Sequence, residues 1–268
     1  MTARTPELVA APLRTLRRTT FWWALGLAVL VAMTMSVWPA VKGASGVSRA
    51  LDQLPSGVVQ AFGLQNFGSP AGFLRGNLYD FFVPLLLAAA AVMLVNGQTA
   101  GEESTGRLEL YLAQPVDRRA VFAGRVIAAL IALIVITAVL LVAQLASDAA
   151  VDLHIDAGYV VSTVVLSALL GILFGGLAAA VAGVGARPPV VLSVGLGVAF
   201  AGLIVSSLFP LSPVLAPWRH LSPWDWAFGG TPLEQGTDLW RFAALAVPAV
   251  ILTAVGVVSV AKRDIAGA

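Results

Sequence analysis

The residues whose types and spacing could do chemistry are concentrated between residues 101 and 119, the longest charged passage of the sequence. Glu102 and Glu103 can offer carboxylates to an arginine or lysine of a partner protein, or to Arg107 in the same segment. Long apolar runs flank the segment on both sides. Its charges and turn residues therefore predict a contact surface for another protein. A solvated loop without a partner is the simpler alternative.

The middle of this segment has the spacing of a short amphipathic helix. Leu108, Tyr111 and Leu112 fall at positions i, i+3 and i+4, which places them on one face of a helix over 107–114. Glu109 points away from that face. The pattern predicts a short helix with a single apolar stripe.

Residues that restrict or free the backbone set the ends of this helix. Gly106 allows the turn before it, and Pro115 disfavours helical backbone at the preceding residue, which ends it. Asp117 can cap the helix that follows, and Arg118 and Arg119 come next. The segment is therefore expected to lie as a short helix between two longer ones.

The composition is that of a chain whose solvent is mostly lipid. Of its 268 residues 59% are hydrophobic and 11% are charged, whereas a globular protein carries about 25% charged residues. The mean hydropathy is +0.90. A net charge of +2 is too small to indicate nucleic-acid binding, and without cysteine the chain has no thiolate metal site or thiol nucleophile.

Six apolar stretches are long enough to cross a hydrocarbon core of about 30 Å at about 1.5 Å per helical residue. We expect an all-α integral membrane protein with one transmembrane domain over residues 1–268. The stretch 41–80 is interpreted as one or two interfacial helices, because Arg49, Asp52 and several glycines interrupt it. The predicted spans are 20–40, 81–98, 120–147, 157–183, 190–209 and 239–261.

The distribution of lysine and arginine predicts the orientation. With the N-terminus inside, five of the 16 Lys and Arg residues fall in outer segments and the other 11 in inner ones. This excess favours a multi-pass protein of the cell inner or plasma membrane, with both termini and the 101–119 segment in the cytoplasm. Arg125, one turn inside the third span, is expected to snorkel toward the headgroups. The five outer residues are Lys42, Arg49, Arg75, Arg219 and Arg241.

Known catalytic motifs are missing from the sequence. A P-loop requires G-x-x-x-x-G-K-[ST], and neither Lys42 nor Lys262 follows a glycine. No H-E-x-x-H or G-x-S-x-G occurs either. Asp152, His154 and Asp156 could bind a metal ion, but a solvated acidic loop explains them more simply. We expect no enzyme activity, no catalytic residue, no cofactor and no metal in this chain.

A secondary transporter driven by ions or protons is the main alternative function. Such proteins place ionisable side chains within their spans, at a cost of several kcal/mol each. The central parts of all six predicted spans carry none, and Arg125 and Arg241 lie near span ends. The driving force is therefore expected to come from another protein.

Small residues recur in the fourth span at four-residue spacing, which lets helix backbones approach closely. They could form a seam with a second subunit or a surface that slides during transport. Packing inside one subunit is the alternative. The predicted helix-packing residues are Gly171, Gly175, Ala179 and Gly183.

The 101–119 segment, placed between the second and third of six spans, resembles the permease subunits of type-2 ABC exporters. Arg107 departs from the family, which often has threonine there. Leu221–Trp226, Pro232-Leu233 and the closing Lys262-Arg263-Asp264 are weaker matches. The matching positions are Glu102, Glu103, Gly106, Leu108, Glu109, Leu112, Ala113, Pro115, Val116 and Arg118.

This resemblance implies that the segment is a coupling helix that docks on a separate ATPase subunit. It further implies a second permease subunit, expected to be a copy of this chain, and ATP with magnesium bound only on the ATPase. The uncharged span centres suggest export of an amphipathic or apolar cargo such as a drug, a lipid or a lipid-like peptide. The residues expected to couple to the ATPase are Glu102, Glu103, Gly106, Arg107, Leu108, Glu109, Tyr111, Leu112, Pro115 and Arg118.

Overall fold

The computed structural model describes residues 5–42, 53–61, 66–105 and 117–262. Over these residues the chain is helical and contains no strand. Six helical stretches are long and apolar enough to cross a membrane, the second being Pro70–Ser104, which contains α5. The prediction of an all-α protein with six spans is confirmed. Their main helices are α1 (Thr5–Lys42), α5 (Phe82–Gln98), α8 (Arg118–Val151), α9 (Ala157–Gly183), α10 (Pro188–Leu208) and α13 (Leu239–Ala261).

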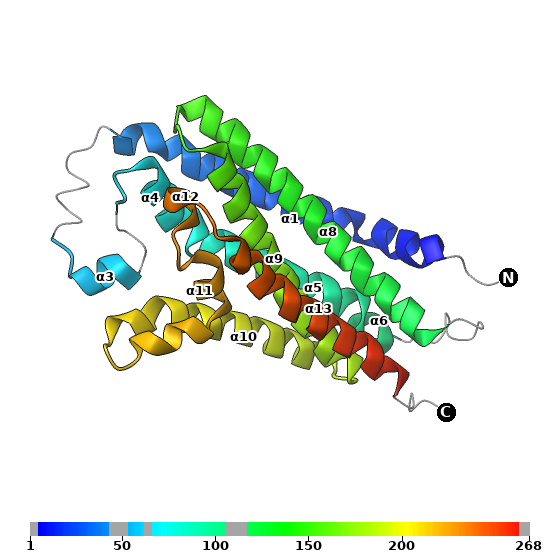
Figure 1. The fold of residues 1–268 in the computed structure, drawn as a ribbon. Coiled ribbons are helices and arrows are strands. Elements are labelled where there is room, and N and C mark those ends of the chain that lie inside the picture. Colours follow the sequence, from blue (N-terminus) through cyan, green and yellow to red (C-terminus); the bar gives the residue numbers. More distant parts are fainter. Residues whose placement is uncertain (1–4, 43–52, 62–65, 106–116, 263–268) are drawn as a thin grey trace.

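Successive long helices run in opposite directions along the bundle (Figure 1). The two ends of the bundle differ in the elements that they carry. The start of α1, the end of α13 and the short helix α6 (Ala100–Ser104) lie at one end, which we call the terminal end. At the opposite end, called the far end, lie the shorter helices. These are α3 (Ser56–Ala61), α4 (Pro70–Leu74), the π-helix η1 (Arg75–Tyr79), the 3-10 helices η2 (Phe209–Leu211) and η3 (Ala216–Leu221), α11 (Pro223–Phe228) and α12 (Pro232–Gln235).

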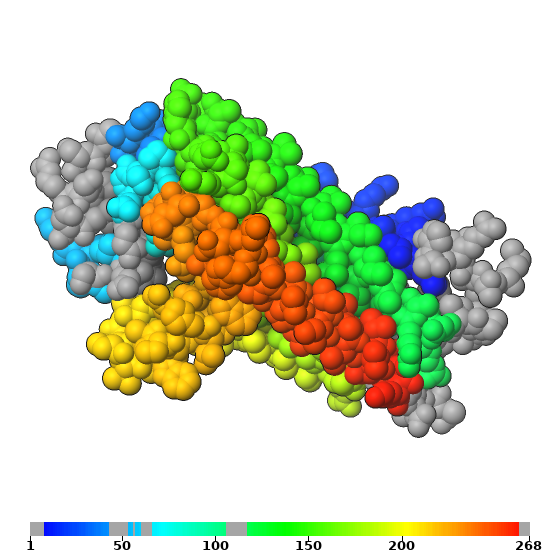
Figure 2. All heavy atoms as spheres, in the orientation of Figure 1, coloured from blue at the N-terminus to red at the C-terminus, as the bar shows by residue number. Residues whose placement is uncertain are grey.

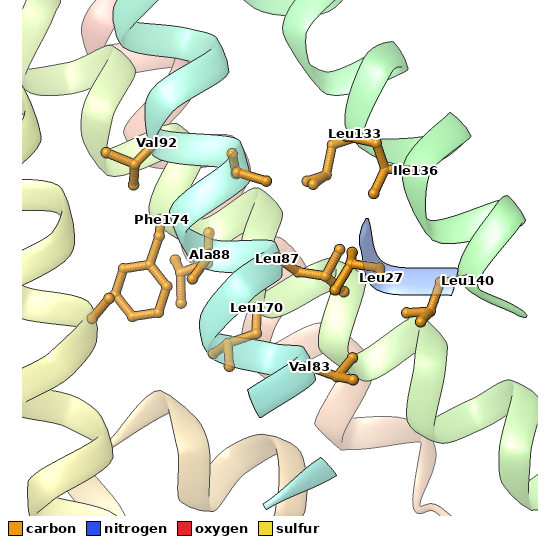
Figure 3. Close-up of a cluster of buried hydrophobic side chains, with 14 of the residues drawn as sticks. Leu27, Val83, Leu87, Ala88, Val92, Leu133, Ile136, Leu140, Leu170 and Phe174 are labelled. Carbon is orange, nitrogen blue, oxygen red and sulfur yellow. The ribbon is translucent and has the colours of Figure 1, made fainter. Parts of the chain in front are cut away.

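Helix α9 lies at the centre of the bundle and contacts α5, α8, α10 and α13. Figure 3 shows α5 between its neighbours, with Leu87 directed toward Leu27 of α1 and Ala88 toward Phe174 of α9. Leu87 and Ala88 are fully buried, and Leu27 and Phe174 are each 2% exposed. Because lipid tails are as apolar as leucine, such contacts stabilise the bundle by close packing rather than by removal from water.

Apolar side chains also cover much of the outer surface. Figure 2 shows α13 lying across the face of the molecule between α8 and α10. Its Val247, Val250 and Ile251 are each more than half exposed. A soluble protein rarely exposes so large an apolar surface, whereas lipid solvates it directly. These side chains support the assignment of a multi-pass membrane protein.

The fourth and sixth helices have the predicted bounds, and the first and third are longer than predicted. The predicted 20–40 span is part of the longer helix α1, so residues 5–19 are helical rather than a separate polar tail. Helix α8 extends beyond residue 147 through Asp148, which is buried within it rather than part of an acidic loop. Asp156 caps α9, its Oδ1 accepting hydrogen bonds from the N–H groups of Gly158 and Tyr159.

The interpretation of 41–80 as interfacial helices is wrong for its last ten residues. Helix α4 and η1 continue into the second span, and Leu74, Leu78 and Tyr79 on them are at most 1% exposed. One short helix within the described part of this stretch is α3. Arg75, counted above in an outer segment, pairs with Asp80 and Glu234 within the fold.

Candidate functional site

At the terminal end, α6 extends the second span toward the 101–119 segment. Thr99 lies at the bend between α5 and α6, and its Oγ1 donates a 2.7 Å hydrogen bond to the carbonyl of Val95. Its own carbonyl accepts from the N–H of Glu103 at 3.1 Å. The side chain of Thr105 donates to the carbonyl of Glu102 at 3.1 Å. These bonds fix the direction of α6 and therefore the position of the Glu102 carboxylate.

Glu102 forms an ion pair with Arg125 of α8. Glu102 Oε2 lies 2.6 Å from Arg125 Nη1, and Nη1 also donates to the carbonyl of Gln98 at 3.1 Å. The two side chains are 16% and 6% exposed. Removing either partner would be costly, because it would leave the other charge uncompensated inside the protein. It ties the end of the second span directly to the start of the third.

The position of Arg125 follows from the cap of α8. Asp117 Oδ1 accepts a 3.0 Å hydrogen bond from the N–H of Arg119, so α8 begins at Arg118. Arg125 then lies two turns into the helix. The expectation that Arg125 snorkels to the headgroups is wrong, because a carboxylate on α6 holds it inside the protein.

Helix α1 covers the other side of this ion pair. A cavity of about 70 Å³ beside Glu102 and Arg125 is lined by Leu8, Pro12 and other residues of α1. A Cβ built on Gly124 would lie 2.9 Å from the carbonyl oxygen of Leu8. Glycine at this position therefore allows α1 and α8 to approach closely. Three spans meet around the Glu102–Arg125 pair.

The sequence of this bundle can now be compared with known families. Residues 8–260 match the family model described as "Multidrug efflux system permease Rv1217c, C-terminal domain". The chain belongs to this family. It is therefore a permease of an efflux system. A search of curated proteins finds no match.

Only part of the predicted coupling segment of this efflux permease falls within the described residues. Glu102 and Glu103 lie on α6, both partly buried, and Arg118 is exposed at the first turn of α8. The coupling helix itself stays a prediction. The residues outside the described part are Gly106, Arg107, Leu108, Glu109, Tyr111, Leu112 and Pro115.

The small residues of α9 pack against other helices of the same subunit. A Cβ on Gly171 would lie 3.1 Å from the carbonyl oxygen of Leu87 in α5, and one on Gly175 would lie 3.4 Å from Ala91 Cβ. Gly183 faces the backbone of Gly256 in α13 so closely that no side chain fits between them. Ala179 also contacts Gly256 through its carbonyl. These four positions therefore serve packing within the efflux permease.

The far end of the permease holds a second group of charges, which are partly buried. Arg75 Nε lies 3.0 Å from Asp80 Oδ2, and Arg75 Nη1 lies 3.3 Å from Glu234 Oε1. Sequence reasoning missed this group because Glu234 follows Arg75 by 159 residues. The sequence showed only that Arg75, Asp80 and Glu234 lie close to apolar runs, which does not indicate that they pair.

The Asp152–Asp156 loop, considered above as a metal site, has structural roles. His154 Nδ1 lies 2.7 Å from the carbonyl oxygen of Asp152, and Asp156 caps α9. Within the described residues, no three His, Cys, Asp or Glu side chains come close enough to hold a metal ion.

Proposed function

We propose that this efflux permease is the transmembrane subunit of an ATP-driven type-2 ABC exporter. ATP and magnesium would bind to a separate ATPase subunit, and the 101–119 segment would carry the movement of that subunit to the spans. A second permease, expected to be a copy of this chain, would complete the transport path. The family match and the order of residues in the segment support this proposal.

The single observation that carries the proposal is the Glu102–Arg125 ion pair. The helices that flank residues 106–116 are joined to each other by this pair, 2.6 Å between Oε2 and Nη1. A force applied to the intervening segment would therefore act on α5 and α8 together. Both helices pack on the central α9. A partner that moves the segment would shift three spans at once.

The proposed orientation places the terminal end in the cytoplasm of a cell inner or plasma membrane. Eleven of the 16 Lys and Arg residues belong to segments assigned to that side. The positive-inside rule favours this arrangement. An ATPase in the cytoplasm could then reach α6 and the start of α8 directly.

The uncharged centres of the spans support an external energy source. The described helices α5, α9 and α10 contain no Asp, Glu, Lys, Arg or His. The buried Arg125 and Asp148 lie toward opposite ends of α8. An ion-coupled carrier usually needs ionisable groups within its spans. The same apolar interior suits a drug, lipid or other amphipathic cargo.

Reconstitution tests the energy source directly. Vesicles containing the permease and an ABC ATPase that co-purifies with it should accumulate a fluorescent amphipathic drug only with hydrolysable ATP. Dissipating the proton gradient should leave this transport running. Uphill transport by the permease alone would refute the proposal. Arrest of the ATP-driven transport by a protonophore at constant ATP would also refute it.

The docking role is tested best at Glu103. Replacing Glu102 with lysine would place a second cation against Arg125, so a loss of activity could reflect a damaged fold. Glu103→Lys leaves the Glu102–Arg125 pair in place and should abolish stimulation of the partner ATPase. Glu103→Gln, the conservative control, should retain a larger share of the ATPase stimulation than Glu103→Lys. Normal stimulation and transport by Glu103→Lys would contradict docking at α6.

A further inference from the structure

A large cavity opens at the far end between the second span, α10 and α11. Its volume is about 650 Å³, within the range of about 300–1,000 Å³ for small-molecule sites. The lining comes from Arg75–Phe82, from the last turns of α10 and from residues 219–231. It is separate from the Glu102–Arg125 site at the terminal end, and nothing in the proposed coupling mechanism uses it.

Aromatic rings form much of the cavity wall. Phe81 and Phe82 lie edge to face with ring centroids 5.1 Å apart, and they are 39% and 48% exposed. Trp224 and Phe228 of α11 contribute from the opposite side. Trp224 is held by Phe174 of α9, with ring centroids 5.4 Å apart. The wall therefore combines fixed and accessible rings, which suit a flat apolar body or the face-on approach of a cation.

Carboxylates outnumber guanidinium groups among the charges at and directly behind this wall. Asp80, Asp225, Arg75 and Arg219 line the cavity, and Glu234 lies behind, 3.3 Å from Arg75. Arg241 also lies behind the wall, where it donates to the carbonyls of Asp225 and Trp226 and is paired with Asp238. Four acidic and three basic side chains leave a formal charge of −1 in this group. The excess is partly buried, because the side chains of Asp80, Asp225 and Glu234 are 24%, 14% and 20% exposed. A cation would be favoured here over an anion.

Asp225 is the carboxylate best placed to meet a ligand. Arg75 holds Asp80 through both oxygens, at 3.0 and 3.2 Å. Asp225 is paired more loosely, its Oδ1 lying 3.6 Å from Arg219 Nε, and the side chain of Arg219 is 41% exposed. Its Oδ2 lies 2.8 Å from His220 Nδ1, on a side chain that is 63% exposed. A cationic ligand could therefore replace the exposed Arg219 and His220 as the partner of this partly buried carboxylate.

A second observation at the same wall also points to a ligand. The indole N–H of the buried Trp224 has no hydrogen-bond partner among the described residues. Buried polar groups are nearly always paired, so such a donor marks strain or a missing partner.

We propose that this cavity binds a lipophilic organic cation, with its charge beside Asp225 and its apolar body against Phe81, Phe82 and Trp224. The cavity would then be the exit-side cargo site of the exporter, an assignment that rests on the proposed function and orientation. Binding itself needs neither ATP nor the ATPase, so it can be measured on the permease alone.

Equilibrium dialysis of the permease in lipid nanodiscs tests the proposal, with empty nanodiscs subtracted for partition into lipid. The probes are tetraphenylphosphonium and tetraphenylborate, which have the same shape and opposite charge. The permease should bind tetraphenylphosphonium saturably and at least about tenfold more tightly than tetraphenylborate, the effect of one unit charge near a protein surface. Equal affinity for the two probes, or no saturable binding of the cation, would overturn the proposal.

Variants locate the bound cation. Ser207 lines the cavity on α10, so Ser207→Trp should fill it and abolish binding. Ser193→Trp, the same change at an exposed site on the same helix outside the lining, should leave binding unchanged. Asp225→Asn should weaken binding of the phosphonium by about tenfold and leave the borate unaffected. Unaltered phosphonium binding by both Ser207→Trp and Asp225→Asn would place the ligand elsewhere.

Two further results separate misfolding of a variant from loss of binding, and the cavity proposal from the exporter proposal. Should Ser207→Trp fail to fold, Phe82→Ala removes an accessible ring at the rim and should still weaken binding severalfold. Unchanged affinity in that variant would contradict the aromatic contact. Binding without ATP-driven transport would refute the proposed exporter but not the cavity site. ATP-driven transport without this binding would refute the cavity site but not the exporter.

Discussion

Removing the carboxylate of Glu102 should destabilise the permease substantially. In Glu102→Gln, Arg125 would lose the negative charge now 2.6 Å from its Nη1, while its side chain stays 6% exposed. Breaking a buried ion pair from one side costs about 3–5 kcal/mol. The lower end applies because the Glu102 side chain is 16% exposed and water reaches it. About 3 kcal/mol corresponds to a fall in melting temperature of roughly 6–12 °C for a chain of this size.

Thermal unfolding of the purified permease in detergent measures this loss. Arg119→Gln is the matched control for Arg125→Gln, the other single variant of this pair, since it removes the same charge from an exposed position on the same helix, α8. It should change stability by less than about 0.5 kcal/mol. The exchanged variant Glu102→Arg/Arg125→Glu restores opposite charges and should recover part of the stability lost in each single variant.

A double-mutant cycle decides whether the pair acts as a unit. The coupling energy between residues 102 and 125 should fall between about 1 and 3 kcal/mol. If the two single changes add within about 0.5 kcal/mol, the pair contributes nothing specific. The mechanical link between the second and third spans would then have to be abandoned.

Three other predictions concern packing, orientation and energy source. Gly183→Ala should destabilise by about 1–3 kcal/mol because its Cβ would meet the backbone of Gly256. Gly197→Ala, where a Cβ meets no atom within 4 Å, should not, and equal effects would contradict the close approach of α9 and α13. In this cysteine-free chain, membrane-impermeant maleimide should label a cysteine at Ser104 only from the cytoplasm and one at Asp152 only from outside. The reverse would invert the orientation. Drug efflux from cells should fall on ATP depletion more than on loss of the proton gradient, and the opposite ranking would favour an ion-coupled carrier.

The number and type of the spans could be predicted because local sequence determines them. An apolar run long enough to cross lipid has no alternative to a helix, since every backbone polar group must be paired inside the segment. Helices α9 and α13 have the predicted bounds because polar residues interrupt the apolar pattern at both ends, Asp156 before α9 and Lys262 after α13. Helix α1 is longer than predicted because residues 5–19, which are helical but carry several arginines, do not have the composition of a membrane span.

The partners of buried charges could not be predicted from local sequence. Arg75 pairs with the nearby Asp80 but also with Glu234, 159 residues away, and Arg125 pairs with Glu102 on another helix. Arg125 was therefore expected at the lipid headgroups and Arg75 in an outer segment, although both side chains are held within the fold. The cavity beside Asp225 was hidden for the same reason, since its walls come from three separate parts of the chain.

The lengths of α1 and α8 have a mechanical consequence. At about 1.5 Å per residue, their 38 and 34 residues give lengths of about 57 and 51 Å, against a hydrocarbon core of about 30 Å. The two helices lie side by side along the bundle (Figure 1). If each helix moves as a stiff rod of this length, a tilt of about 5° about one end would displace the other by about 5 Å. In the proposed orientation, this pair would act as a lever that carries a small push from the cytoplasmic end to the opposite face of the membrane.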